Sequence, residues 1–145
     1  MVDHLFEPFN IPKNLVRQLE ATPPYPLKSG LDGLEPDGKG IYALYMEDPV
    51  TPVYVGKTDQ AGKVRKRLIE HGKKIAARDK ISITDVRFRY LVMEENWLAR
   101  ACEEFLITHY KPKWQGSGFG SHVPGAGRPG LKGPDQFTKW YPVKK

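Results

Sequence analysis

Apolar and polar residues follow two different periods along the chain, and these periods predict a small mixed fold. Short apolar runs bounded by Gly, Pro and Asp predict three strands, at 40–46, 53–56 and 85–93. Helical patterns are expected from Asn10 to about Ala21, in the basic segment after the loop 59–62, and over 95–110. This order indicates an α/β (α+β) layer fold, in which a three-stranded mixed or antiparallel sheet is flanked by helices.

Two of these segments have a predicted apolar face. The strand over 85–93 is expected to place one clearly apolar set on one side, consisting of Val86, Phe88, Tyr90 and Val92. The opposite side would carry Arg87, Arg89, Leu91 and Met93. The last helix is expected to bury a single stripe, consisting of Leu98, Ala101, Cys102, Phe105 and His109, and to end before Pro112.

The basic helix has an inward side that includes two polar residues. Its apolar stripe consists of Val64, Leu68 and Ile75, which lie within about 40° of one another at 100° per residue. Arg67 and His71 fall on or beside this stripe, and their burial costs desolvation unless a polar site surrounds them. We therefore expect these two residues to form the polar floor of a cleft, with a hydrogen-bonded core histidine as the alternative for His71. Other cations of the helix point away: Arg65, Lys66 and Lys73.

Length and composition favour one domain. The chain of 145 residues is expected to fold as a single unit over 1–145, with an N-terminal helix and loop (1–37), a core (38–115) and an irregular Gly- and Pro-rich arm (116–145). The lone Cys102 excludes an intramolecular disulfide, and no Cys/His set has zinc spacing. The sequence carries no signal peptide pattern and no apolar run of membrane-spanning length, which predicts a soluble cytoplasmic protein with no membrane partner.

The positive charge is concentrated in one segment. The chain has a formal net charge of +6, and residues 61–80 carry all of this excess, with eight Lys and Arg against Glu70 and Asp79. A helix with this charge is expected to face a nucleic-acid phosphate backbone. The alternative is an ordinary solvated helix face.

Two adjacent acids in the last helix have different neighbours. Glu104 lies four residues after Arg100, which predicts a surface ion pair. Glu103 has Ala99 four residues before it and Ile107 four residues after it, so its carboxylate needs a metal ion or a cation to offset its desolvation. We therefore expect Glu103 to be the metal ligand, with an unremarkable helix charge as the alternative.

Two tripeptides in the first strands lead to a family resemblance. Gly40-Ile41-Tyr42 and Tyr54-Val55-Gly56 are followed by Arg67, by His71 four residues later, and by Glu103 in a helix that ends in Tyr110-Lys111-Pro112. This order resembles the GIY-YIG endonuclease superfamily over roughly residues 38–115. The resemblance implies a DNA endonuclease with one Mg²⁺ or Mn²⁺ in each active site. The family usually has Asn twelve residues after its Glu, whereas this chain has Gln115.

The resemblance also implies roles for the site residues. Tyr42 would be the general base, helped toward a phenolate by nearby positive charge, and Arg67 would bind the scissile phosphate. Tyr54 and His71 would orient phosphate or water, and Glu103 would hold the metal ion. The further candidates for phosphate or substrate binding are Lys57, Arg65, Lys66, Gln115 and Arg128.

The flanks resemble the type II restriction endonuclease branch of that superfamily. This likeness rests on Phe9-Asn10, Pro26-Leu27, the run 40–45, and the tail motifs at 118–122, 124–125 and 127–128. It implies a homodimer that cuts both strands of a short palindrome in double-stranded DNA, with a separately encoded methyltransferase as a possible partner. Candidate readers of guanine edges are Lys28, Arg128 and Lys132.

Two other functions stay open at this stage. A repair-type or nonspecific nicking nuclease of the same superfamily would share the motifs and would lack site recognition. A non-catalytic nucleic-acid-binding module would use the basic helix alone, with the tyrosines as packing residues. Glu103 separates the two classes, because a carboxylate in a basic cleft repels phosphate and serves no purpose in a pure binder.

Overall fold

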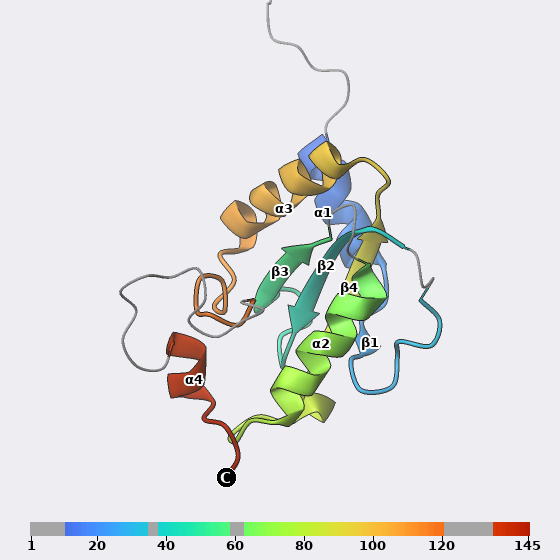
Figure 1. Ribbon diagram of the computed structural model, residues 1–145. Helices are drawn as coiled ribbons and strands as arrows, with labels where there is room; N and C mark the ends of the chain where they lie inside the picture. Colours follow the sequence, from blue (N-terminus) through green and yellow to red (C-terminus); the bar gives the residue numbers. More distant parts are fainter. Residues whose placement is uncertain (1–10, 35–37, 59–62, 121–134) are drawn as a thin grey trace, which may run out of the picture.

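The computed structural model describes residues 11–34, 38–58, 63–120 and 135–145 (Figure 1). Its helices are α1 (Ile11–Ala21), α2 (Val64–Ala76), α3 (Asn96–Tyr110) and α4 (Gln136–Trp140). Its strands are β1 (Tyr25–Pro26), β2 (Gly40–Tyr45), β3 (Tyr54–Lys57) and β4 (Arg87–Val92). The expected α+β class and helix-flanked sheet are confirmed. Arg128, Lys132, Asn10 and the loop 59–62 lie outside the described residues.

The sheet is antiparallel and has four strands in the order β1-β4-β2-β3. The three expected strands are present, and β1 adds a short edge strand in a segment expected to be irregular. Tyr25 of β1 lies opposite Phe88 of β4. β4 begins at Arg87, two residues later than expected, because a 3-10 turn occupies Ile83–Asp85 with Ser82 as its cap.

The register of β2 and β3 brings Tyr42 opposite Gly56. A Cβ atom at Gly56 would lie 2.4 Å from both Cζ and the hydroxyl oxygen of Tyr42. Only glycine therefore leaves room for the Tyr42 ring to lie across β3. The second tripeptide of the motif thus supplies the space that the tyrosine of the first tripeptide occupies.

Helices cover both faces of the sheet. On one face, Tyr42 and Leu44 pack with Leu68 and Ile75 of α2. On the other face, a second cluster joins α1 and α3 to the sheet and includes Leu19. Figure 1 shows α2 crossing in front of the strands, whereas α1 and α3 lie together beyond them. The predicted inward stripe of α2 is confirmed, and α1 buries Leu15 and Leu19.

The expected apolar set around β4 was partly wrong, because Val92 is 56% exposed, although Val86, Phe88 and Tyr90 lie in the core under α2 as expected. The opposite side of the strand is covered as well. Phe88 belongs to the cluster under α2, whereas Leu91 packs against the cluster under α1 and α3. Arg89 lies on the latter side and is 7% exposed. Its guanidinium donates to the backbone carbonyls of Thr22 and Pro49 and lies over the Tyr45 ring. Those contacts offset the cost of burying an arginine where an apolar residue would otherwise be expected.

The expected stripe of α3 was also partly wrong. Cys102 is buried as expected, but Ala101 and His109 are exposed. The buried positions of this helix are Ala99, Cys102 and Leu106. The helix is therefore rotated relative to the predicted stripe, so that the side next to Glu103 faces the sheet.

The described parts of the arm belong to the main core, which differs from the expected irregular tail. Phe119 and Phe137 are essentially buried and pack against Trp114, with ring centroids 4.8 and 5.1 Å from that of the indole. α4 begins at an N-cap, where Asp135 accepts a hydrogen bond from the backbone of Thr138. This packing joins the C-terminal segment to α2.

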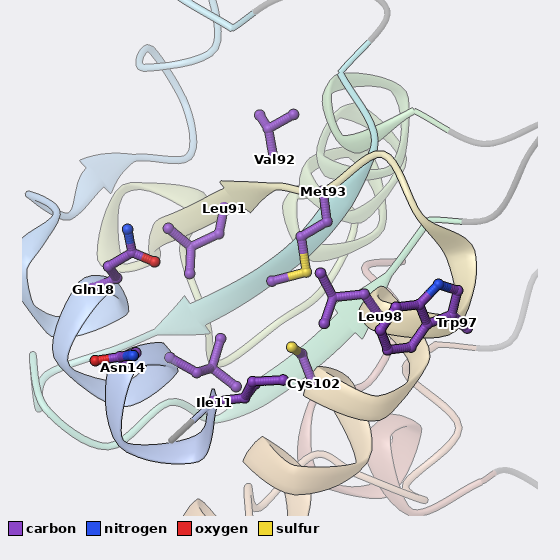
Figure 2. Close-up of a pocket in the computed structure, with 10 residues that line it drawn as sticks. Ile11, Asn14, Gln18, Leu91, Val92, Met93, Trp97, Leu98 and Cys102 are labelled. Atoms are coloured by element: carbon purple, nitrogen blue, oxygen red, sulfur yellow. The ribbon is translucent and has the colours of Figure 1, made fainter. Parts of the chain in front are cut away.

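An apolar groove opens between α1, α3 and the end of β4, on the face of the sheet away from Tyr42 (Figure 2). Its volume is about 510 Å³, and Trp97 and Leu98 lie at one end of it. The Cys102 side chain is directed into this groove, away from Tyr42 and His71. Among the described residues, none of the helices is both long enough and apolar enough to span a bilayer.

Candidate active site

The centre of the candidate site is a buried hydrogen bond between Tyr42 and His71. The Tyr42 hydroxyl lies 2.7 Å from Nε2 of His71, and the two residues come from β2 and from the inward side of α2. Tyr42 is fully buried and His71 is 3% exposed. The expected inward position of His71 is present, and its partner is a residue of the motif.

Tyr54 completes a group of three rings around this bond. Its ring centroid lies 6.3 Å from that of Tyr42 and 5.5 Å from that of His71. Phe119 closes the opposite side, stacked on His71 at 4.6 Å and placed edge-on to Tyr54 at 4.9 Å. The imidazole is therefore held by aromatic surfaces on several sides.

Arg67 lies one helical turn before His71 and acts on both tyrosines. Its side chain is 15% exposed, and Nη1 lies 3.0 Å from Oε2 of Glu70. Burial lowers the pKa of Arg67, but Tyr42 and Glu70 raise it by more, so the guanidinium keeps its positive charge. This places one fixed cation beside the two phenol groups.

Burial dominates the acidity of the two tyrosines. The pKa of Tyr42 is raised well above its usual value by burial and by Tyr54, and the nearby Arg67 offsets only part of this rise. Burial likewise raises the pKa of Tyr54. Desolvation of the charged form therefore exceeds the attraction of the Arg67 guanidinium, so this cation alone does not bring Tyr42 toward a phenolate.

Glu103 extends from α3 toward the same site. Burial raises the pKa of its carboxyl group, while Lys57 at the end of β3 lowers it. The charge of Glu103 in turn raises the pKa of Tyr42 and of Tyr54. Lys57, a candidate for phosphate binding, therefore lies close enough for its charge to act on Glu103. The predicted ion pair between the neighbouring Glu104 and Arg100 is present and exposed, with a 3.4 Å contact.

The donor set at Glu103 fits a hydrated hard cation. Within the described ranges, no three His, Cys, Asp or Glu side chains come together as a metal cage. Glu103 supplies one half-buried carboxylate, and the burial of its charged form is unfavourable until a cation faces it. Such a donor suits Mg²⁺, since this ion is usually held by one or two carboxylates and keeps several waters. Mn²⁺ accepts the same oxygen ligands.

Gln115 contacts the backbone of β3. Its Oε1 accepts from the Val55 N–H at 3.1 Å, and its Nε2 donates to the Val55 carbonyl at 2.9 Å. The adjacent Trp114 N–H donates to the Val53 carbonyl at 2.8 Å. These bonds hold β3 from its outer side and give Gln115 a structural role.

The basic helix contains two kinds of cation. Lys63, Lys66 and Lys73 are exposed, as a phosphate-binding surface requires, whereas Arg65 is half-buried with its Nε fully enclosed. Two further cations of the segment are engaged with the C-terminal region instead: Lys74 and Arg78. The charge that faces solvent is therefore smaller than the sequence count of +6 for this segment.

Sequence reasoning missed the part that Phe119 and Gly120 play around the tyrosines. A Cβ atom at Gly120 would lie 2.3 Å from the Tyr54 hydroxyl, so the backbone passes directly over that group. The signals in the sequence were the tail motif at 118–122 and, within it, an aromatic residue between Gly118 and Gly120. Neither signal specifies which residues the aromatic ring contacts.

Comparison with known proteins adds one finding to this geometry. A family model described as the Eco29kI GIY-YIG domain matches residues 41–135, which is about two thirds of the chain. Its range includes Tyr42, Tyr54, Arg67, His71 and Glu103. No curated protein matches the chain significantly.

Proposed function

The chain belongs to the Eco29kI GIY-YIG domain family of restriction-type nucleases, and on that premise we propose that it is a metal-dependent type II restriction endonuclease. Membership makes the protein a DNA endonuclease. The proposal adds that it uses Mg²⁺ or Mn²⁺ and that, as a homodimer, it cuts both strands of a short palindrome in double-stranded DNA. A two-fold symmetric protein suits a two-fold symmetric site.

The observation that carries the proposal is the buried 2.7 Å contact between the Tyr42 hydroxyl and His71 Nε2, with Arg67 and Glu103 close enough for their charges to act on Tyr42. Since the pKa of Tyr42 is raised by burial, the phenol is neutral and its proton needs an acceptor. With the His71 ring neutral and its proton on Nδ1, Nε2 is that acceptor. His71 would thus be the final proton acceptor, whereas the sequence interpretation gave that part to a Tyr42 phenolate stabilised by nearby cations.

Hydrolysis would proceed through these groups with its protons accounted for. The attacking water gives a proton to the Tyr42 oxygen as that hydroxyl passes its own proton to His71 Nε2. The new bond forms between the water oxygen and phosphorus, the bond from phosphorus to the 3′ oxygen breaks, and the 3′ oxygen takes a proton from solvent. Arg67 would bind a non-bridging oxygen of the scissile phosphate and stabilise the charge that develops there.

A divalent ion held by Glu103 would supply positive charge to the phosphate and to the leaving oxygen. Lys57, next to Glu103, would limit the repulsion between this carboxylate and DNA. Tyr54 would orient the phosphate or water, and the exposed Lys66 would meet the DNA backbone, with Arg65 beside it. Arg128, Lys132 and Lys28 remain candidates for base contacts.

The cellular setting follows from the same proposal. A restriction enzyme acts on DNA in the cytoplasm, and the lone Cys102 is compatible with a reducing compartment. A DNA methyltransferase with the same recognition sequence would protect the host genome.

The non-catalytic binding module is less favoured, since it leaves the Tyr42–His71 bond and the half-buried Glu103 without a purpose.

Cleavage of supercoiled plasmid DNA with Mg²⁺ tests the proposal. Wild type is compared with Tyr42→Phe and Glu103→Ala, and the cut ends are mapped by sequencing. Discrete double-strand fragments that are lost in both variants support a restriction enzyme. Scattered nicks support the nicking alternative. Binding without cleavage on several plasmids, unchanged by either substitution, contradicts the catalytic assignment.

A further inference from the structure

Phe119 lies against the candidate site although it is not part of the two tripeptides or the Arg67, His71 and Glu103 series. It lies 48 positions after His71 in the sequence, in the segment that follows α3, and its ring stacks on the imidazole with a centroid distance of 4.6 Å and an interplanar angle of 26°. It also contacts Tyr54 edge-on at 4.9 Å. At 1% exposure it is enclosed on all sides.

The Phe119 ring is fixed by residues of α2 itself. Lys74, three positions after His71, donates from Nζ to the carbonyls of Gly118 at 2.9 Å and Phe119 at 2.7 Å. The same ammonium group lies 5.4 Å from the centre of the Phe119 ring. His71 and Lys74, which holds the stacking partner Phe119, therefore lie on the same helix, so their relative placement is rigid.

The stack restricts a motion that matters for proton transfer. A half-turn of the imidazole about its Cβ–Cγ bond puts Cε1 in the place of Nε2 and Cδ2 in the place of Nδ1, and during that turn the ring must sweep out of its plane. A parallel ring at 4.6 Å blocks this sweep. Tyr42 meets the imidazole at its Nε2 edge, so the two contacts together define one orientation.

From this geometry we propose that Phe119 is a positioning residue for the cleavage reaction, which holds the His71 imidazole with Nε2 toward the Tyr42 hydroxyl. The inference rests on the proposed nuclease mechanism. Phe119 touches neither water nor phosphate in this scheme and acts through His71. Since misplacement of a reacting group by about 1 Å can cost about 10²-fold in rate, loss of the planar stack is expected to lower kcat by about that factor and to leave KM for DNA unchanged.

Two substitutions separate planarity from volume. Phe119→Met keeps an apolar side chain of similar size and removes the flat ring, and it is expected to lose about 10²-fold in kcat. Phe119→Tyr keeps the flat ring and is expected to restore most of the rate. Phe88→Met is the matched control, because Phe88 is equally buried in the same cluster and its ring contacts are with Tyr25 and Tyr90. Circular dichroism and thermal melts confirm that each variant folds.

A spectroscopic readout tests the orientation without cleavage. Long-range proton–nitrogen NMR correlations report which ring nitrogen carries the proton in each of the four histidines, and His71→Gln assigns the signals of His71. We expect one tautomer in wild type, in Phe119→Tyr and in Phe88→Met, and a mixture in Phe119→Met, because a turned ring loses the Tyr42 contact at Nε2 that favours one tautomer. If wild type does not cut DNA, the nuclease proposal fails, and these spectra still decide the positioning role.

Three results would overturn the inference. The first is a Phe119→Met variant that cuts at the wild-type rate. The second is an unchanged His71 spectrum in that variant. The third is an equal loss of kcat in Phe88→Met, which would mean that any damage to this core slows cleavage.

Discussion

The hydroxyl of Tyr42 and Nε2 of His71 lie 2.7 Å apart, although 29 positions separate the two residues in the sequence. The bond joins the centre of the sheet to the helix that covers it, and both partners are almost completely removed from water. In such surroundings a hydrogen bond is strong, and a missing partner is costly. The pair is therefore a structural link and, in the proposed mechanism, a path for a proton.

Replacement of Tyr42 by phenylalanine separates these two consequences. Tyr42→Phe is expected to lower the cleavage rate by about 10²–10⁴-fold, since it removes the group that takes the proton from water. It also leaves Nε2 of His71 buried without this partner, which is expected to lower the free energy of unfolding by about 1–3 kcal/mol. Single-turnover cleavage and urea denaturation measure the two effects.

Tyr90→Phe is the control for this substitution. Tyr90 lies directly opposite Tyr42 in the register of β2 and β4 and belongs to the same face of the sheet. Its variant is expected to cut DNA at nearly the wild-type rate. A Tyr42→Phe enzyme within threefold of wild type in cleavage would remove Tyr42 from the chemistry.

The thermal stability of Glu103→Gln tests whether Glu103 is the metal ligand. Burial raises the pKa of Glu103, so the folded metal-free protein binds the carboxyl proton more tightly than the unfolded chain does. This contribution to stability is present at pH below the usual carboxyl pKa and is lost as pH rises through the raised value. Without metal, Glu103→Gln is therefore expected to melt at a higher temperature than wild type near neutral pH, and at a similar temperature in acid.

Added Mg²⁺ should reverse that order. The ion is expected to stabilise wild type and to leave Glu103→Gln unchanged, because an amide is a poor substitute for a carboxylate as a ligand for a hard cation. Differential scanning calorimetry at several pH values and Mg²⁺ concentrations makes the measurement. Glu104→Gln, next in the helix and exposed, should behave as wild type. Equal stabilisation of all three proteins by Mg²⁺ would place the metal elsewhere.

Gln115→Asn tests whether the amide supports β3 or binds phosphate. The side chain of Asn is shorter by one methylene and cannot make both bonds to the Val55 backbone. Loss of these bonds is expected to lower the free energy of unfolding by about 1–2 kcal/mol, with the DNA affinity of the folded protein unchanged. Urea denaturation and fluorescence anisotropy with labelled DNA measure both quantities. Weaker DNA binding at unchanged stability would instead assign Gln115 to phosphate.

The exposed side of α2 can be tested by the salt dependence of DNA binding. Lys66→Gln is expected to weaken binding to all sequences alike and to reduce the slope of log K against log salt by about 1, the value for one lost phosphate contact. Arg17→Gln on α1, which covers the opposite face of the sheet, is the control and should leave the slope unchanged. Equal slopes for Lys66→Gln and wild type would exclude this face of α2 from the DNA interface.

Local patterns predicted the main helices and strands and the main residues of the candidate site, but they missed β1 and α4. The period of α2 placed Leu68 inside and His71 beside it, and the surface pair of Arg100 with Glu104 followed from their spacing. Helix and strand periods are properties of short segments, so they can be read from the chain directly. The buried Arg89 was missed, because its partners are carbonyls of loops far away in the sequence.

The sequence by itself determined the α+β class, the order of the main elements and the family, since a strand period, a helix period and a spaced motif need no distant contact to be visible. The tertiary structure decided how the motif is used. In the folded chain, the Tyr42 hydroxyl contacts His71, Phe119 stacks on the imidazole, and Lys57 lies close enough for its charge to act on Glu103. It also decided that burial outweighs Arg67 in the acidity of Tyr42, because desolvation depends on everything packed around a group and not on its neighbours in the chain.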